Sequence, residues 1–156
     1  MKFIVIAVVI ALAIFYFSRN STNKKVALEN IATGKDFLAK NKTNEDVIET
    51  ASGLQYQVLQ KGEGSAHPSS SSTVKVHYHG LLLDGTVFDS SVERDTPISF
   101  PLNQVISGWT EGVQLMVVGD KFKFFIPAEL GYGNRATGKI TPGSLLIFEV
   151  ELLEIQ

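Results

Sequence analysis

The chain of 156 residues contains no cysteine and only five prolines. The lack of cysteine excludes disulfides, thiolate metal sites, cysteine nucleophiles and lipid-modified cysteines. Acidic residues are missing from residues 1–25, which hold four basic side chains, so residues 26–156 carry 10 basic and 16 acidic groups. A segment with that net charge of −6 is a poor binder of nucleic-acid phosphates, and we expect no nucleic-acid partner.

Residues 3–17 form an apolar run without a charge, between Lys2 and Arg19. As a helix this run spans about 22 Å, short of the ~30 Å hydrocarbon core of a bilayer. That length suits a secretory signal, and also an anchor whose flanking basic side chains reach the headgroups. Because no small-x-small cleavage site follows directly, we favour an uncleaved anchor at residues 1–18. Basic residues on both sides leave its orientation open.

Residues 19–50 are predicted to be a polar tether with a short helix over residues 26–40, in which Gly34 is a weak point. Its short length and Gly34 favour a monomer, with dimerisation through this helix as the alternative. Residues 51–156 form the predicted folded domain. Alternating apolar and polar residues predict strands at 54–58, 74–79, 121–126 and 146–152, the first with Gln55 facing solvent.

The pair Asp84-Gly85 predicts a hairpin turn, and the spacing of Trp109, Val113 and Met116 predicts a helix over residues 109–116. Several strands with a single short helix and no alternation of strand and helix indicate an α+β fold. We expect a twisted antiparallel sheet wrapped around that helix, preceded by the apolar N-terminal helix.

Motifs for metal, phosphate or nucleophile chemistry are incomplete. His77 and His79 share one strand face, but no third ligand is spaced for them, so we expect no metal site. Residues 133–139 match the first seven positions of a phosphate-binding loop, yet Ile140 stands where Ser or Thr is needed and no helix follows. No serine lies in a Gly-x-Ser-x-Gly turn. The sequence therefore predicts no cofactor.

A set of large apolar residues flanks predicted loops, where core residues are uncommon. Its members are Tyr78, Phe88, Val105, Ile106, Trp109, Tyr132 and Phe148. Spacing alone leaves open whether they form core or line a pocket.

Several segments, taken in order, decide between these possibilities: residues 76–80, 84–91, 105–112, 126–127, 132–133 and 148–153. Together they resemble the FK506-binding-protein family of peptidyl-prolyl cis/trans isomerases, from about Gly53 to Ile155. Residues 37–41 and 50–56 also resemble the exported, macrophage-infectivity-potentiator-like bacterial branch. This resemblance implies an inner-membrane anchor with the catalytic domain in the periplasm, or a soluble periplasmic protein if the signal is cleaved.

The resemblance also implies a role for each site residue. Trp109 would form the floor of a proline pocket, and Tyr132 would offer its hydroxyl, with the Ile106 N–H as a second donor, to the substrate. Asp89 would sit at the rim. The remaining predicted site residues are Tyr78, Phe88, Val105 and Phe148 in the pocket wall, and Ile98 and Ile140 as further substrate-binding positions.

The function that the resemblance implies is isomerisation of X–Pro bonds during the folding of exported proteins, with a non-catalytic chaperone module as the alternative. Expected partners are extended proline-containing polypeptides and macrolides of the FK506 type. The sequence departs from the family at Ile98, where many relatives have an aromatic residue, at Lys139 and Thr141, and in a shorter loop after Tyr132. These changes affect substrate preference and macrolide affinity more than catalysis.

Overall fold

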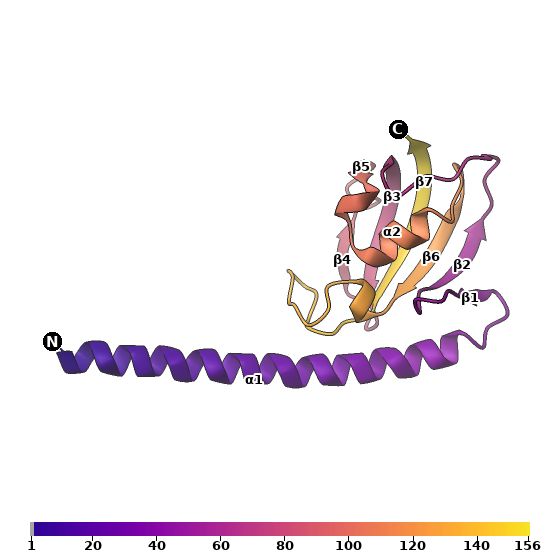
Figure 1. Cartoon of the computed structure of the whole chain (residues 1–156). Helices are drawn as coiled ribbons and strands as arrows, with labels where there is room; N and C mark the ends of the chain where they lie inside the picture. Colours follow the sequence, from indigo (N-terminus) through magenta and orange to yellow (C-terminus); the bar gives the residue numbers. More distant parts are fainter. Residues whose placement is uncertain (1) are drawn as a thin grey trace.

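The computed structural model describes the backbone of residues 2–156 and the side chains of residues 6–156 (Figure 1). A 40-residue helix, α1 (Lys2–Asn41), extends from the N-terminus to one end of a β-rich domain, where its C-terminal half lies against the domain. The C-terminus of the chain lies at the opposite end of this domain.

The continuity of α1 corrects the first part of the predicted tether, residues 19–25, and the separate helix at 26–40, because both belong to one helix. Residues 18–25 contain neither proline nor glycine and lie between two helical segments. Continuing a helix adds one hydrogen bond for each residue fixed, whereas ending it leaves backbone groups unpaired and requires a new nucleus. The argument for a monomer from a short, interrupted helix therefore loses its basis. The division into three regions remains a prediction.

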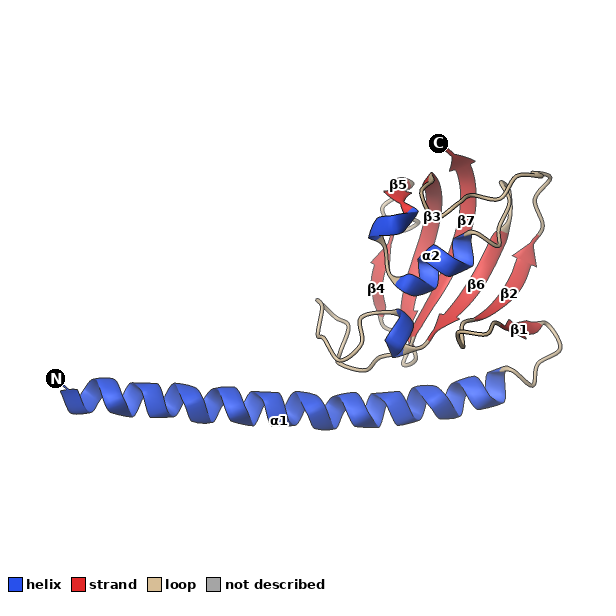
Figure 2. Cartoon of the chain, in the orientation of Figure 1, coloured by secondary structure: helices blue, strands red, loops and turns tan. Residues whose placement is uncertain are grey.

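Seven strands form one sheet in which every pair is antiparallel (Figure 2). The order across the sheet is β1-β2-β6-β7-β3-β4, and β5 pairs with the first part of β3. The strands are β1 (Val47–Glu49), β2 (Gln55–Gln60), β3 (Thr73–Leu82), β4 (Val87–Ser90), β5 (Ile98–Pro101), β6 (Lys121–Ile126) and β7 (Leu146–Ile155). The four predicted strands and the α+β fold are confirmed. Of the other three strands, β4 was implied only by the predicted hairpin turn, and β1 and β5 were not predicted.

The hairpin between β3 and β4 turns at Asp84-Gly85, as predicted. Thr86 N–H donates to the Asp84 carboxylate, and Gly85 adopts the positive φ of 86° that such turns require. Buried side chains alternate along β3 and β7 and form the core with β6.

Helix α2 (Ser107–Val113) lies across one face of the sheet (Figure 2). It begins earlier and ends earlier than the predicted 109–116, and Met116 is buried in the turn that follows. A Cβ at Gly108 would lie 2.7 Å from the Ile126 side chain, and one at Gly112 would lie 2.6 Å from the Phe124 ring. These glycines therefore allow the helix to approach the sheet closely. The described residues also form two 3₁₀ turns, η1 (Leu102–Gln104) before α2 and η2 (Ala128–Leu130) after β6.

The C-terminal half of α1 contacts the domain with one face, on which buried or half-buried residues recur every three or four positions: Ala27, Asn30, Ile31, Gly34, Phe37, Leu38 and Asn41. The Asn30 amide donates to Thr141 Oγ1 at 3.0 Å and to the Pro142 carbonyl at 2.8 Å. Gly34, predicted as a weak point, is the position where helix and domain meet, because its Cβ would lie 3.3 Å from Leu145 Cβ.

Gln55 is fully buried rather than solvent-facing, because the end of α1 covers it. Its Nε2 donates to the Leu38 carbonyl and to Glu49, and its Oε1 accepts from Asn41 at 2.9 Å. The contact between α1 and the domain thus contains hydrogen-bonded polar groups as well as apolar side chains.

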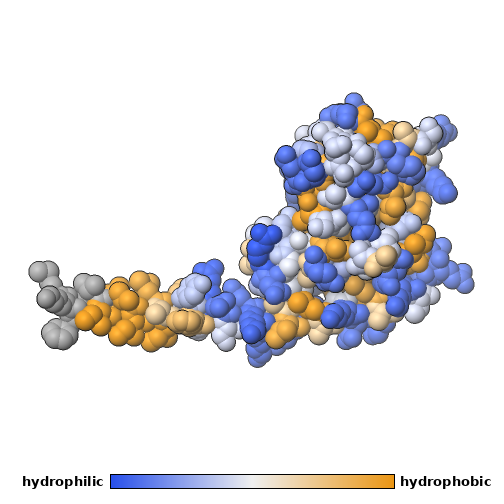
Figure 3. Space-filling view, viewed as in Figure 1, coloured by the Kyte–Doolittle hydropathy of each residue, from blue (hydrophilic) through white to orange (hydrophobic). Residues whose placement is uncertain are grey.

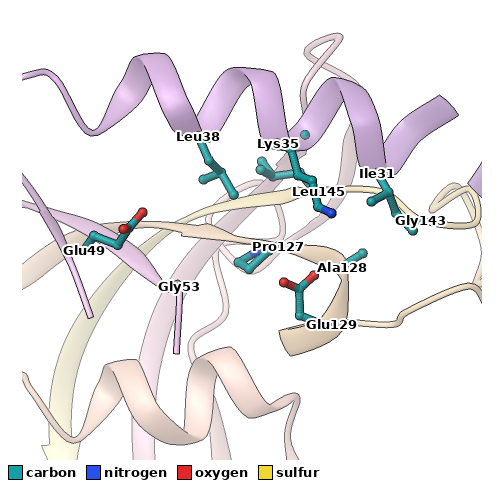
Figure 4. A pocket seen from close by; sticks show the side chains of 11 residues that line it. Ile31, Lys35, Leu38, Glu49, Gly53, Pro127, Ala128, Glu129, Gly143 and Leu145 are labelled. Carbon is teal, nitrogen blue, oxygen red and sulfur yellow. The ribbon is translucent and has the colours of Figure 1, made fainter. Parts of the chain in front are cut away.

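A groove of about 140 Å³ remains between α1 and the domain (Figure 4). Its floor is aliphatic, with Ile31 and Leu38 from the helix and Pro127, Ala128 and Leu145 from the domain. We refer to it below as the α1 groove.

Candidate functional site

A larger cavity, of about 520 Å³, opens where α2, β3, β5 and β7 meet. This volume lies within the range of ~300–1,000 Å³ typical of ligand pockets. Its lining residues are Tyr78, Asp89, Phe100, Gln104, Val105, Ile106, Ser107, Trp109, Gly131, Tyr132, Arg135 and Phe148. We refer to it as the aromatic cavity.

Aromatic rings surround the indole of Trp109 at the centre of this cavity. The ring centroids of Tyr78, Phe100 and Phe148 lie 5.3–5.6 Å from that of Trp109, with interplanar angles of 81–84°. Edge-to-face contacts of this kind hold aromatic side chains in one orientation. Phe88 in turn supports Phe148 from behind, with a centroid distance of 5.2 Å. These ring contacts therefore define the shape of the cavity.

The indole nitrogen of Trp109 is buried, and among residues 6–156 it has no hydrogen-bond partner. Leaving a buried donor unpaired costs about 1–3 kcal/mol. Such a cost in an otherwise well-satisfied core indicates that Trp109 is placed for the surface it offers to the cavity rather than for stability.

One side of the rim is a hydrogen-bonded triad of Tyr78, Asp89 and Arg94. The Tyr78 hydroxyl donates to Asp89 Oδ2 at 2.5 Å, and Arg94 donates to Asp89 Oδ1 at 2.5 Å and to the Tyr78 oxygen at 3.1 Å. Burial raises the pKa of Asp89, but the hydrogen bonds from Tyr78 and Arg94 outweigh it and leave the pKa below its ordinary value. Burial, reinforced by Asp89, raises the pKa of Tyr78 above its ordinary value. Asp89 is thus a charged rim residue whose carboxylate is already hydrogen-bonded to Tyr78 and Arg94.

The Tyr132 hydroxyl and the Ile106 N–H are donors at the cavity that the proposed chemistry can use. Within the described side chains the Tyr132 hydroxyl has no hydrogen-bond partner, although the side chain lines the cavity. The Ile106 N–H precedes the first turn of α2, and none of the hydrogen bonds among the described residues uses it. Both groups can donate to the carbonyl of a bound peptide.

Seven of the ten predicted site residues line the aromatic cavity, namely Tyr78, Asp89, Val105, Ile106, Trp109, Tyr132 and Phe148. Phe88, Ile98 and Ile140 do not line it. Ile98 pairs with Val76 and packs on the core, and Ile140 is buried. Their roles in binding remain predictions.

Sequence reasoning missed Phe100, Gln104, Ser107, Gly131 and Arg135. Phe100 follows Ile98 by two residues on β5, so both lie on the same face of that strand, and Phe100 is the one that reaches the cavity. The sequence did contain a signal for Phe100, because Ile98 stands where many relatives have an aromatic residue and Phe100 lies two residues further on. Arg135 lies within residues 133–139, which match an incomplete phosphate-binding loop.

His77 and His79 are engaged locally. The Nδ1 of His77 lies 2.7 Å from Ser91 Oγ, and that of His79 lies 2.7 Å from Ser90 Oγ. Among the described side chains no group of three or more His, Cys, Asp or Glu residues is arranged to hold a metal ion. Residues 133–139 form turns that lead into Thr141 and Pro142, without a helix to hold a phosphate.

The comparisons with known proteins agree with this geometry. Residues 64–153 match the family described as FKBP-type peptidyl-prolyl cis-trans isomerase. The chain belongs to this family. Residues 10–58 match the domain amino-terminal to FKBP-type peptidyl-prolyl isomerase, which covers most of α1 together with β1 and the start of β2.

Individual relatives are similar over most of this chain. It is 57% identical over 132 residues to the FKBP-type isomerase FkpA of Aeromonas hydrophila, covering 85% of this chain and 49% of the relative. It is 44% identical to the outer membrane protein MIP of Legionella longbeachae, covering 88% of this chain and 59% of that protein. The crystal structure of FkpA from Escherichia coli superposes with a TM-score of 0.90 at 41% identity, over 96% of this chain and 70% of that one. The chain thus spans about half to three-fifths of the length of these curated relatives.

Proposed function

We propose that this FKBP-type chain is a peptidyl-prolyl cis/trans isomerase that rotates X–Pro bonds inside the aromatic cavity. The observation that carries the proposal is the preformed cavity over Trp109 in a chain of this family. Its predicted substrates are unfolded or extended proline-containing segments of exported proteins.

The chemistry requires rotation of a bond rather than its cleavage. The barrier of about 18–20 kcal/mol arises from the partial double-bond character of the planar amide. For X–Pro the two isomers differ by only ~0.5–1 kcal/mol, yet they exchange in tens of seconds or longer. An enzyme that lowers this barrier needs no nucleophile and no proton transfer. This fits a cavity in which Asp89, the one carboxylate among the described lining residues, is already paired with Arg94.

The aromatic cavity lowers the barrier in two ways. Water stabilises the charge-separated planar amide more than the twisted one, so apolar walls remove an advantage of the ground state. The Tyr132 hydroxyl and the Ile106 N–H then hold the peptide through its carbonyl groups. A millionfold acceleration needs about 8 kcal/mol, whereas one hydrogen bond supplies only ~1–3. Desolvation and fit over Trp109 must therefore supply most of the effect.

A protease-coupled proline isomerisation assay on the full chain in detergent tests the proposal. The rate of the slow phase should rise in proportion to protein concentration. A background rate with the native circular dichroism spectrum retained would contradict isomerisation and favour the alternative, a chaperone module that binds peptides in the same cavity. Suppression of aggregation of a proline-free client would identify that alternative.

The N-terminal half of α1 supports membrane attachment. Its large apolar side chains from Ile6 to Phe17 are each more than half exposed. Figure 3 shows an apolar surface along this part of the helix on the face in view. Among the described residues, α1 is the one helix that is long and apolar enough to cross a membrane. We infer that this part anchors the chain in the inner membrane with the domain in the periplasm, the alternative being a cleaved signal. The mass of the mature protein recovered from membranes distinguishes the two.

Macrolides of the FK506 type are proposed ligands of the same cavity, since they carry a proline-like ring that the cavity can bury. The fluorescence of Trp109, the single tryptophan of the chain, reports their binding directly. The predicted monomer is tested by light scattering on the detergent-solubilised chain.

A further inference from the structure

The charges around the aromatic cavity are uneven. Asp89 and Arg135 are its charged lining residues. Asp89 is paired with Arg94, which neutralises that side of the rim. For Arg135, by contrast, no carboxylate of residues 6–156 lies within 4 Å, and its side chain is exposed. The mouth of the cavity therefore carries one uncompensated positive charge.

The backbone beneath Arg135 is held in place. Its N–H donates to the Tyr132 carbonyl at 3.2 Å, and the Gly143 N–H donates to the Gly133 carbonyl at 2.8 Å. Arg135 thus follows Tyr132, a proposed substrate-binding residue, by three positions in a closed turn. An exposed guanidinium on a hydrogen-bonded turn beside a binding cavity is suited to pairing with a carboxylate.

The charge of the rest of the domain makes this position distinctive. Residues 26–156 carry a net charge of −6, which repels acidic peptides at a distance. A single unpaired arginine at the mouth supplies the local attraction that such a peptide needs to enter.

We propose that Arg135 determines substrate specificity, by favouring X–Pro segments with Asp or Glu next to the proline over segments with Lys or Arg there. This inference rests on the proposed function and names the substrate class of the same cavity. Because both partners are partly solvated, the preference is modest, about two- to five-fold between Glu and Lys peptides. It should shrink as added salt screens the charges.

The test uses peptides with Glu, Gln or Lys immediately before or immediately after the proline. Isomerisation is followed by exchange NMR, which requires no protease and so tolerates every residue at these positions. The full chain is compared with Arg135→Gln, which removes the charge, and Arg135→Glu, which reverses it. Lys61→Gln is the matched control, because Lys61 is an exposed base that does not line the cavity.

The expected result is a higher kcat/KM for Glu than for Lys peptides in the wild-type chain at one of the two positions. Arg135→Gln should bring this ratio to about one, Arg135→Glu should invert it, and Lys61→Gln should leave it unchanged. A wild-type ratio of one at both positions, or a ratio that survives in Arg135→Gln, overturns the inference.

Binding is measured in parallel through the fluorescence of Trp109. If no peptide is isomerised, the proposed function fails, and the ratio of the Kd values for Glu and Lys peptides still decides the role of Arg135. Equal Kd values in that case overturn the inference independently.

Discussion

The aromatic cavity and the α1 groove are two hollows of the same domain with different construction. The cavity holds about 520 Å³ and is bounded by rings around Trp109, whereas the groove holds about 140 Å³ over an aliphatic floor. At the cavity the Trp109 N–H, the Tyr132 hydroxyl and the Ile106 N–H lack partners among the described residues. Beside the groove, the Asn30 amide nitrogen donates two hydrogen bonds to the domain, and both ends of the Gln55 amide are hydrogen-bonded.

This difference separates a binding site from a packing contact. Free donors and an exposed charge are useful only where a ligand will meet them, since buried polar groups otherwise cost stability. Satisfied amides and glycines at close approach are what two surfaces need to stay together. Substitutions at the cavity should therefore change activity first, and substitutions at the groove should change stability first.

The largest expected effect is that of removing the cavity floor. Trp109→Ala should lower kcat/KM by about 100-fold, corresponding to roughly 3 kcal/mol of lost contact with the twisted peptide. Because this side chain is also part of the core, Trp109→Phe is the matched variant. It retains a ring and eliminates the unpaired N–H, so its urea midpoint should change little while kcat/KM falls about tenfold. Wild-type activity in either folded variant would contradict the role of the indole.

The next effect belongs to the α1 groove. Gly34→Leu places a side chain where a Cβ already lies 3.3 Å from Leu145, and it should lower the free energy of unfolding in urea by about 2 kcal/mol. The kcat/KM of the folded variant should stay within about twofold of the wild type. Ala39→Leu, on the exposed face of the same helix, is the control and should unfold like the wild type. A large loss of activity with unchanged stability would remove the distinction between the two hollows.

A smaller effect is expected at the free hydroxyl of the cavity. Tyr132→Phe should lower kcat/KM by about three- to tenfold, because it removes one hydrogen bond worth roughly 1 kcal/mol and leaves the apolar walls intact. The melting temperature should not change, since this hydroxyl has no partner among the described side chains. A loss comparable to that of Trp109→Ala would show that hydrogen bonding, rather than desolvation, drives the reaction.

The smallest effect concerns pH. The lowered pKa of Asp89 and the raised pKa of Tyr78 keep the first charged and the second neutral, so kcat/KM should be flat between about pH 5.5 and 8.5. A bell-shaped profile in this window would indicate proton transfer and contradict the mechanism.

Stability should respond to pH only outside that window. Because the pKa of Asp89 is depressed on folding, its contribution is present above about pH 4 and is lost as the pH falls further. Because the pKa of Tyr78 is raised on folding, its contribution is present below about pH 10 and is lost as the pH rises through the folded-state value. Urea midpoints of the wild type and Tyr78→Phe across the alkaline range measure the second contribution.

Strands that alternate strictly could be predicted from the sequence, because their buried faces repeat every two residues, as along Val74, Val76 and Tyr78. The short strand β1 could not, because its three residues gain their order from pairing with β2. The burial of Gln55 was equally hidden, since it depends on where the end of α1 lies. Most of the cavity could be assigned through the family resemblance.

The site residues that the sequence did not predict are those whose position depends on tertiary structure. Phe100 and Ile98 share a strand face, but Phe100 is the one that packs against Tyr78 and Trp109 and lines the cavity. Arg135 carries no local motif, and its position at the mouth follows from the turns that bring residues 131–135 beside α2. Nothing in the local pattern distinguishes such residues from an ordinary surface loop.

Exchange NMR of a neutral Leu–Pro peptide, with and without catalytic amounts of the full chain, tests the central claim most directly. The account predicts exchange cross-peaks between cis and trans signals on a sub-second scale with the wild-type chain, greatly weakened with folded Trp109→Phe. Exchange at the uncatalysed rate with the wild-type chain, or undiminished exchange with the variant, would contradict it.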